Sequence, residues 1–349
     1  MPLESLRLQE FGAFEDVTFE FCPGLNVIIG ENATGKSHAM KAAYSILRSL
    51  QRAGPKDDAE IVALRLRDKL SGVFRPQDGE IGRLVRRAPG SKTTASLRLE
   101  ATKASVEASI NRRSSLELSL FRGGFSESAI FLPSREVLAL FEGFIAAYDA
   151  RELSFDETYY DTCKALSATL LRGVRAERAR KLLEPLREAL GGTVSSSNGR
   201  FYVKQGRANM EAHLVSEGLR KIASVYHLIN NGSLAKNSVL FWDEPEANLN
   251  PRLVDRVARF LLSLIASGMQ VIVASHDYLL THRLSLQVEY QRLPKGSKVR
   301  FFALSRRTGP SSAVELEHGD TLADLEHNAI LEEFARFYDD EEQVALGVK

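Results

Sequence analysis

An eight-residue run near the N-terminus has the spacing of a phosphate-binding loop. It fits the pattern G-x-x-x-x-G-K-[ST] and consists of Gly30, Glu31, Asn32, Ala33, Thr34, Gly35, Lys36 and Ser37. Glycines let backbone N–H groups surround a phosphate, and the positive end of a following helix adds to the attraction. We expect Lys36 to reach the β- and γ-phosphates of a nucleotide and the Ser37 hydroxyl to ligate Mg²⁺.

Two adjacent acids follow a second apolar run, which spans residues 238–242. Asp243 at the carboxyl end of such a buried strand would hold the magnesium through its water shell. Glu244 would then orient or deprotonate an attacking water. The alternative is an acidic helix cap, which the accompanying phosphate-binding loop disfavours.

A third buried strand, over residues 271–274, leads directly to His276, which is expected to reach the γ-phosphate. Upstream, Ser216 and Gly218 open a helical pattern as Ser-x-Gly, an arrangement suited to anions although Ser is also a common helix cap. Asn250 before Pro251 reads as a helix N-cap followed by the first helical residue.

These residues need elements that position them. The apolar run 25–29 predicts a strand before the loop. After the loop, apolar residues spaced along one face predict a helix that ends near residues 54–55. A second helix is predicted from Pro251 to about Gly268. Residues 95–99 and 116–120 alternate as short antiparallel strands do. Residues 135–190 read as helices and 201–203 as a strand; the expected core positions of the helices are Leu166, Leu170, Val174, Leu182 and Leu183.

Taken together, the motifs resemble an ATP-binding-cassette (ABC) ATPase head of the SMC, RecF and overcoming-lysogenization-defect (OLD) type. Such heads carry a Walker A loop, a signature Ser-x-Gly, a Walker B strand with a catalytic Glu, a D-loop and a switch His, and all five occur here in that order. The run 243–251, Asp-Glu-Pro-Glu-Ala-Asn-Leu-Asn-Pro, is similar to the one in prokaryotic OLD-like ATPases. The signature, Val-Ser-Glu-Gly-Leu over 215–219, departs from the L-S-G-G-Q of transporter ATPases.

The resemblance implies an α/β P-loop NTPase: an ABC/SMC-like ATPase head with a mixed sheet, an antiparallel β subdomain and a helical insertion. It implies ATP and Mg²⁺ as cofactors, and Glu244, His276 and Lys36 as catalytic residues. Ser216 and Gly218 would contact the γ-phosphate of a partner protomer in an ATP-dependent homodimer. Asn250 of the D-loop is a further candidate for nucleotide contact. Residues 133–135 lie where a Q-loop might run, or form a simple turn.

The expected organisation has four parts. Residues 1–90 form the N-terminal half of the head with Walker A, and 91–205 form an inserted β-rich and helical lobe. Residues 206–310 form the C-terminal half with signature, Walker B, D-loop and switch His, and 311–349 form an acidic C-terminal segment. No heptad run spans four heptads, which argues against a long coiled-coil arm.

The charge balance is nearly even, with 46 Lys and Arg against 45 Asp and Glu, which argues against a protein that coats nucleic acid with its whole surface. Within it, residues 83–122 carry nine basic and three acidic side chains, and 314–349 carry eleven acidic and two basic ones. The basic segment reads as a solvated face or a contact for nucleic acid or an acidic protein. Two cysteines, no signal-like N-terminus and no long apolar run predict a cytoplasmic protein without a membrane contact.

The expected function is Mg²⁺-dependent ATP hydrolysis by a head-to-tail dimer. A larger assembly of such dimers is left open. By resemblance, it acts as a switch or scaffold for a separate effector such as a nuclease or toxin, in prokaryotic antiphage defence. One alternative is a DNA repair and recombination ATPase of the RecF type. Another is an ATP-binding scaffold that sequesters a toxin with little turnover, and the Glu244–His276 pair argues against it. A membrane-transporter ATPase is disfavoured by the nonstandard signature.

Overall fold

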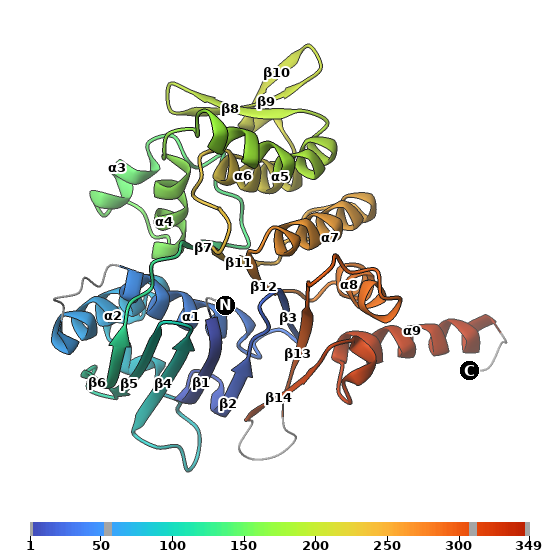
Figure 1. Ribbon diagram of the computed structural model, residues 1–349. Coiled ribbons are helices and arrows are strands. Elements are labelled where there is room, and N and C mark those ends of the chain that lie inside the picture. Colours follow the sequence, from blue (N-terminus) through green and yellow to red (C-terminus); the bar gives the residue numbers. More distant parts are fainter. Residues whose placement is uncertain (1–2, 52–57, 307–312, 346–349) are drawn as a thin grey trace.

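A six-stranded mixed sheet forms the centre of the protein (Figure 1), seen in a computed structural model that describes residues 3–51, 58–306 and 313–345. Its strand order is β14-β13-β3-β12-β11-β7. The strands are β3 (Leu25–Gly30), β7 (Ala129–Leu132), β11 (Val239–Asp243), β12 (Gln270–Ala274), β13 (Val299–Arg306) and β14 (Val314–Gly319). All neighbours pair in parallel except β13 with β14. The sequence motifs on β3, β11 and β12 therefore end at one edge of the sheet.

The central strands are buried on both faces because each face has its own hydrophobic core. Successive side chains of a strand point to opposite faces. Val27 and Ile29 of β3 belong to one core, whereas Ile28 belongs to the other. This explains why β3, β11 and β12 read as continuous apolar runs, without the alternation of a half-exposed strand.

A five-stranded antiparallel sheet packs on the core that contains Ile28, with strand order β2-β1-β4-β5-β6. Its strands are β1 (Leu3–Phe11), β2 (Phe14–Glu20), β4 (Thr94–Ala101), β5 (Ala104–Asn111) and β6 (Leu116–Gly123). Its buried residues share that core with helix α1 (Lys36–Gln51), and α2 (Ala59–Phe74) packs against α1. The phosphate-binding loop thus sits between a strand and a helix that are both held on several sides.

The opposite core supports a second lobe, drawn at the top of Figure 1. It contains a three-stranded sheet, β10-β9-β8, and four helices. These elements are α3 (Phe144–Asp149), α4 (Glu157–Leu166), α5 (Val174–Leu190), β8 (Thr193–Ser197), β9 (Arg200–Gln205), β10 (Ala208–Glu211) and α6 (Glu217–Asn230). Three more helices, α7 (Pro251–Ala266), α8 (Tyr278–Glu289) and α9 (Ala329–Ala345), follow on the right of the view, where α9 projects from the body.

A buried polar cluster joins the Walker A helix to this upper lobe. The Lys69 ammonium group of α2 lies 2.6 Å from Glu157 Oε1 and 2.6 Å from Asp161 Oδ2, both on α4. Tyr44 of α1 donates its hydroxyl to the same Asp161 oxygen at 2.6 Å. Nearer the phosphate-binding loop, Lys41 pairs with Asp156, the N-cap of α4, at 2.8 Å. Buried charges satisfied in this way specify one geometry between α1, α2 and α4.

Most of the elements expected from the sequence are present in the structure. The strands predicted around 95–99, 116–120 and 201–203 are present in β4, β6 and β9, and the helix from Pro251 is α7. Leu166 and Leu183 are buried, and Leu182 is partly buried. The prediction of core positions at Leu170 and Val174 is wrong, because their side chains are 44% and 65% exposed in the turn before α5 and at its start. The expected helix end at residues 54–55 lies outside the described residues.

The structure divides the expected lobe 91–205 between two bodies. Strands β4–β6 pair with β1 in the antiparallel sheet, and β7 joins the central sheet beside β11. Only α3 to β9 stand in the upper lobe, together with β10 and α6 from beyond residue 205. β14, from the expected acidic segment 311–349, is an edge strand of the central sheet. Hydrogen bonding between strands, not charge or order along the chain, sets these groupings. No helix among the described residues combines the length and the apolar character that crossing a bilayer requires.

Candidate nucleotide site

The loop between β3 and α1 can be built only with glycine at its two ends. Gly30 has φ +145°, and a Cβ there would lie 2.3 Å from the carbonyl oxygen of Leu304. Gly35 has φ +98°, and a Cβ there would lie 2.7 Å from the Phe14 ring. Within the loop, Thr34 donates its hydroxyl to the Glu31 carbonyl at 2.8 Å. The loop is therefore held by its flanking strands, and it leads directly into the N-terminus of α1.

Lys36, the first residue of α1, is buried against this loop. Its ammonium group donates to the carbonyl oxygens of Gly30 and Glu31 at 2.7 and 2.8 Å. Burial lowers the Lys36 pKa, and the nearby Asp243 and Glu244 carboxylates oppose that shift. A buried cation beside backbone N–H groups makes an anion-binding position, as expected from the sequence.

Ser37 and Asp243 meet although 206 residues separate them in the chain. The Ser37 hydroxyl donates to Asp243 Oδ1 at 3.0 Å. Burial raises the Asp243 pKa, while the hydrogen bond from Ser37 and the charges of Lys41 and Lys36 lower it. A hydroxyl and a carboxylate are the oxygen ligands that Mg²⁺ prefers, so this pair fits the cation that the motif implies.

Glu244 and His276 lie at the ends of two neighbouring parallel strands. His276 Nδ1 is 3.4 Å from Glu244 Oε1, and both side chains are partly exposed. Glu244 has φ +49°, in the left-handed region, and its N–H donates to the Ala274 carbonyl at 2.9 Å. Strained backbone of this kind persists where surrounding structure holds it, and it clusters at functional sites. The strand ends thus place a carboxylate and an imidazole together, open to solvent.

Two further residues, Lys221 and Glu246, support this pair, and the sequence analysis did not single them out. Lys221 of α6 is only 3% exposed, and its ammonium donates to the Glu244 carbonyl oxygen at 3.1 Å. Burial lowers the Lys221 pKa, against the opposing charge of Glu246. Glu246 is buried and accepts from the Ser275 hydroxyl at 2.7 Å and from the His276 N–H at 3.4 Å. A lysine within the apolar stripe of a helix was the signal that could have indicated Lys221.

The signature residues stand at the start of α6 in the upper lobe. Ser216 is the N-cap residue, but its side chain makes no capping hydrogen bond. A Cβ at Gly218 would lie 2.4 Å from Leu249 Cδ2 and 2.6 Å from the Asn248 carbonyl, so glycine permits close packing on the D-loop. Among the hydrogen bonds and ion pairs of the described residues, none joins Ser216 or Gly218 to the phosphate-binding loop. Within one chain, no hydrogen bond or ion pair of the described residues therefore links the signature to the phosphate-binding loop.

Asn250 is engaged as the N-cap of α7. Its side-chain oxygen accepts from the Leu253 N–H at 3.1 Å, as the sequence pattern predicted for a cap before Pro251. This hydrogen bond uses the carbonyl end of the amide. Nucleotide contact by Asn250 remains a prediction.

Residues 133–135 follow β7, the parallel neighbour of the Walker B strand β11. The next residue, Glu136, is buried, and its Oε1 lies 2.8 Å from Nε of Arg220. Arg220 also donates to the Val215 carbonyl at 2.5 Å. The segment after β7 is thus tied to the loop that carries the signature. Its assignment as a Q-loop stays a prediction.

The basic segment 83–122 is less available than its composition suggested. Arg86 is buried, with Glu10 and Glu15 at 3.9 Å, and Arg98 pairs with Glu100 at 2.9 Å. Arg83 lies 3.3 Å from Glu80. The remaining basic side chains of the segment are exposed or partly exposed; they are Arg87, Lys92, Lys103, Arg112, Arg113 and Arg122. Part of the net positive charge of this segment is therefore neutralised by ion pairs within the protein. Nucleic-acid binding by the segment stays a prediction.

Comparison with known proteins places the chain in a family. The family model described as "AAA domain, putative AbiEii toxin, Type IV TA system" matches residues 25–281, which include every motif above. The chain belongs to this AAA-domain family. Together with its other relatives, the match makes it a member of the SMC/RecF-like ABC ATPases, as the motifs indicated. ATP binding and hydrolysis are general properties of that class.

Among curated relatives of this AAA-domain protein are DNA replication and repair proteins RecF. The one from Limosilactobacillus fermentum is 32% identical over 81 residues, 23% of this chain and 22% of the relative. That from Listeria welshimeri is 29% identical over 143 residues, 41% of this chain and 34% of the relative. The chain thus spans only about a fifth to a third of the length of these relatives.

Solved SMC head domains share the fold. An SMC head bound to the C-winged helix domain of ScpA is 15% identical, with a TM-score of 0.56 over 93% of this chain and 99% of that one. A Pyrococcus furiosus SMC head bound to the C-terminal domain of ScpA is 13% identical, with a TM-score of 0.51 over 98% and 100%. At these identities the likeness confirms the predicted ATPase-head fold and nothing finer.

Proposed function

We propose that this protein is a Mg²⁺-dependent ATP hydrolase. The observation that carries the proposal is the Ser37–Asp243 contact at 3.0 Å, which joins two motifs from opposite halves of the chain at the mouth of the phosphate-binding loop. In this proposal Ser37 and Asp243 hold Mg²⁺, and Lys36 with the backbone N–H groups of residues 31–35 binds the phosphates. The bound cation supplies neutralisation of the charge that develops on the phosphates.

Glu244 and His276 complete the chemistry in this proposal. The Glu244 carboxylate orients a water for attack and accepts its proton, and His276 stabilises the γ-phosphate oxygens. The 3.4 Å separation of the two side chains supports a shared task. Ser216 and Gly218 complete the site of a second protomer in a head-to-tail homodimer. This is supported by the position of both residues at the start of α6 in the upper lobe, where no hydrogen bond or ion pair of the described residues ties them to their own phosphate-binding loop.

As an ATP-gated dimer, the protein would act as a switch or scaffold for a separate effector, such as a nuclease or toxin, in prokaryotic antiphage defence. The family description, which names a putative toxin and a type IV toxin–antitoxin system, supports this role. The RecF relatives favour the second candidate, an ATPase in DNA repair and recombination. An ATP-binding scaffold with little turnover is the third.

Phosphate release and sedimentation test the proposal together. Wild-type protein should release phosphate only with ATP and Mg²⁺ both present. Glu244→Gln should abolish release and accumulate the ATP-dependent association of heads, whereas Lys36→Ala should neither bind ATP nor show any association beyond that of the nucleotide-free protein. Tight ATP binding without turnover in the wild type would favour the scaffold over the enzyme. A Glu244→Gln protein that stays monomeric with ATP would contradict the head-to-tail dimer.

A further inference from the structure

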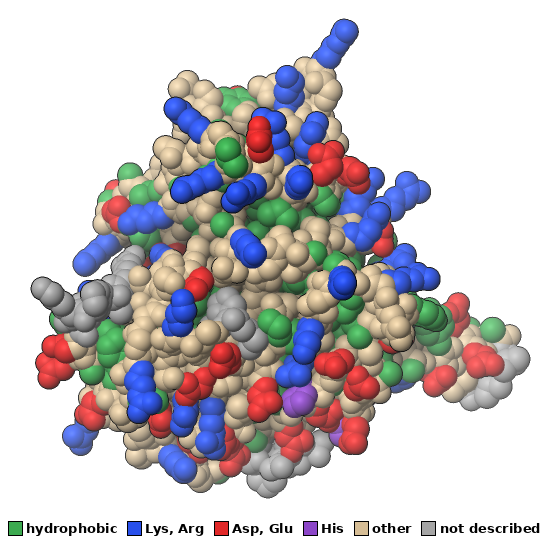
Figure 2. All heavy atoms as spheres, viewed as in Figure 1, with side chains coloured by type: hydrophobic (Ala, Val, Ile, Leu, Met, Phe, Trp, Pro, Cys, Tyr) green, Lys and Arg blue, Asp and Glu red, His purple; other side chains and the backbone are tan. Residues whose placement is uncertain are grey.

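The last helix, α9, carries an apolar stripe that stays largely exposed among the described residues. None of its residues is buried, although Phe334, Phe337, Tyr338 and Val344 are large hydrophobic residues with 40% to 80% of their side chains exposed. Their spacing places them on one side of a helix. We call residues 334–345 the α9 arm. Figure 2 shows apolar and acidic side chains on this projecting arm at the right of the view. Exposed apolar side chains that are grouped in this way often mark an interaction site.

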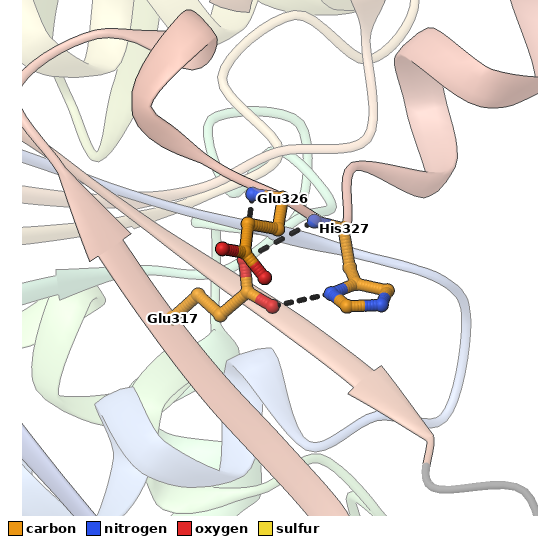
Figure 3. A group of neighbouring side chains, drawn as sticks. All are labelled: Glu317, Glu326 and His327. Carbon is orange, nitrogen blue, oxygen red and sulfur yellow. Dashed lines mark hydrogen bonds and ion pairs between the residues drawn. The ribbon is translucent and has the colours of Figure 1, made fainter.

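The base of the arm is fixed, so its direction is set by the fold. The Glu317 carboxylate of β14 accepts from the backbone N–H groups of Glu326 and His327 at 2.9 and 3.1 Å (Figure 3). It also pairs with His327 Nδ1 at 2.5 Å. Phe334 stacks on Tyr278 of α8, with ring centroids 4.3 Å apart. Glu317, Glu326 and His327 lie close enough to share a cation, but these hydrogen bonds already account for the arrangement.

The arm is also acidic at the end of the helix where acid is least favourable. Asp339, Asp340, Glu341 and Glu342 lie in its last two turns, and Arg336 is the one basic residue of the arm. The C-terminus of a helix carries the negative end of the helix dipole, so these charges repel it. A short isolated helix is marginally stable in water. A cationic, partly apolar surface packed against the arm would offset both deficits.

The same chain carries such a surface on its upper lobe. Residues 172–207 contain nine basic and three acidic side chains, and all nine basic ones are exposed. Three of them share one side of α5 by their helical spacing, and we call these the basic face: Arg175, Arg178 and Lys181. Among the ion pairs of the described residues none involves these three, whereas Arg187 and Arg200 pair with Glu184 and Glu142. The exposed side chains of Leu170 and Val174 stand beside it. Figure 2 shows Lys and Arg side chains gathered over this lobe at the top.

We propose that the α9 arm of one protomer docks on the basic face of a second copy of the chain. The charges are complementary, and exposed apolar side chains lie on the arm and beside the basic face. The arm points away from its own upper lobe (Figure 1), so the second copy is the occupant that supplies a basic face. In a two-fold dimer the contact forms twice, once for each arm. The contact does not require ATP and is separate from the proposed nucleotide sandwich.

A charge-exchange experiment tests the proposal on the full chain without nucleotide. The arm variant carries Lys at positions 339–342, and the face variant carries Arg175→Glu, Arg178→Glu and Lys181→Glu. The arm variant adds cations near the C-terminus of α9, and the face variant adds anions in the N-terminal half of α5. Both changes are favourable for the dipole of the helix concerned. Circular dichroism checks that each variant is folded. Sedimentation velocity over a concentration series then measures self-association.

Wild type should dimerise, and its dissociation constant should rise at least tenfold between 50 and 500 mM salt, as charge pairing requires (an order-of-magnitude expectation). Each variant alone should remain monomeric at concentrations where wild type is dimeric. An equimolar mixture of the two should dimerise, because both contacts of the heterodimer again pair opposite charges. Ile61→Ser with Leu64→Ser, exposed apolar positions on α2, is the matched control and should leave the dimer intact.

Three results would overturn the proposal. They are a wild type that stays monomeric, variants that dimerise as wild type does, and a mixture that fails to dimerise. The last result would place the arm on its own chain or on another kind of partner. Because no nucleotide is present, the outcome of this experiment does not depend on whether the protein hydrolyses ATP. A negative result here would likewise leave the proposed ATPase activity untouched.

Discussion

The ammonium group of Lys221 lies 3.1 Å from the backbone carbonyl oxygen of Glu244. One residue belongs to the helix that follows the signature and the other is the candidate catalytic acid, so the contact joins two motifs within one protomer. Glu244 has a left-handed backbone that needs support from its surroundings. Lys221 is therefore a positioning residue for the carboxylate.

Replacing Lys221 by Met should lower kcat about tenfold, which corresponds to roughly 1.4 kcal/mol of transition-state stabilisation. The KM for ATP should change by less than about threefold, because Lys221 touches none of the loop that binds the phosphates. Steady-state phosphate release separates the two constants. Lys221→Arg should restore part of kcat, whereas a rise in KM with unchanged kcat would argue against a positioning role.

Magnesium binding should depend on pH through Asp243. Burial raises its pKa, so the proton is retained to higher pH than on an exposed aspartate. A protonated carboxyl is a poor ligand, and magnesium affinity should fall as pH drops through this raised pKa. The sign for folding is opposite: ionising Asp243 costs stability, so the Mg²⁺-free protein gains stability from this group as pH falls. Titration of Mg²⁺-dependent nucleotide binding between pH 5 and 8 measures the effect.

Asp243→Asn should remove the pH dependence and weaken magnesium binding at every pH. Ser37→Ala should weaken magnesium binding by about tenfold while leaving the pH dependence in place, since the carboxylate remains. An unchanged pH profile in Asp243→Asn would assign the titration to another group.

The two signature residues should respond differently to alanine. Gly218→Ala should destabilise the fold by about 1–3 kcal/mol, because the new methyl group would clash with Leu249 and the Asn248 carbonyl. Ser216→Ala should change stability by less than about 0.5 kcal/mol, since its side chain makes no capping bond. Urea denaturation compares them. Ser216→Ala should still impair the ATP-dependent dimer, which sedimentation with Mg·ATP detects.

The buried cluster around Lys69 should be costly to break. Lys69→Met would leave Glu157 without its cation and Asp161 with only Arg48, 3.7 Å away, and loss of one partner from a buried pair costs about 3–5 kcal/mol. Arg259→Met removes an exposed pair with Asp255 and should cost less than about 1 kcal/mol. The free energy of unfolding in urea distinguishes these outcomes. Equal losses would mean that solvent reaches the Lys69 cluster.

Local patterns were enough to predict the strands and helices that carry Lys36, Asp243 and His276, because each motif lies directly at an element end. The pairing of Ser37 with Asp243 was also predictable, since carboxyl ends of parallel strands share one edge of a sheet. Contacts made by single buried polar side chains were not. Lys221 and Glu246 act through a backbone carbonyl and a neighbouring loop, and no spacing rule connects them.

Charge counts along the chain were a weaker guide. The excess over 83–122 suggested one basic surface, but Arg86 is buried and Arg98 is paired with Glu100, two residues along the same strand. The exposed basic face lies instead on α5, which the sequence predicted only as a helix. Leu170 and Val174 were predicted to lie in the core because they are apolar, but both are exposed to solvent near that face. Folding decides which charges remain exposed.

The strand order has a consequence for how the protein is made. β3 carries the phosphate-binding loop, but its two neighbours in the sheet are β12 and β13, which begin at Gln270 and Val299. At about 5–20 residues per second, a ribosome needs on the order of ten seconds or longer to synthesise the intervening chain. Until then β3 has neither neighbour, and the loop lacks the Leu304 backbone against which Gly30 packs. Nucleotide binding should therefore appear only after β13 has left the ribosome.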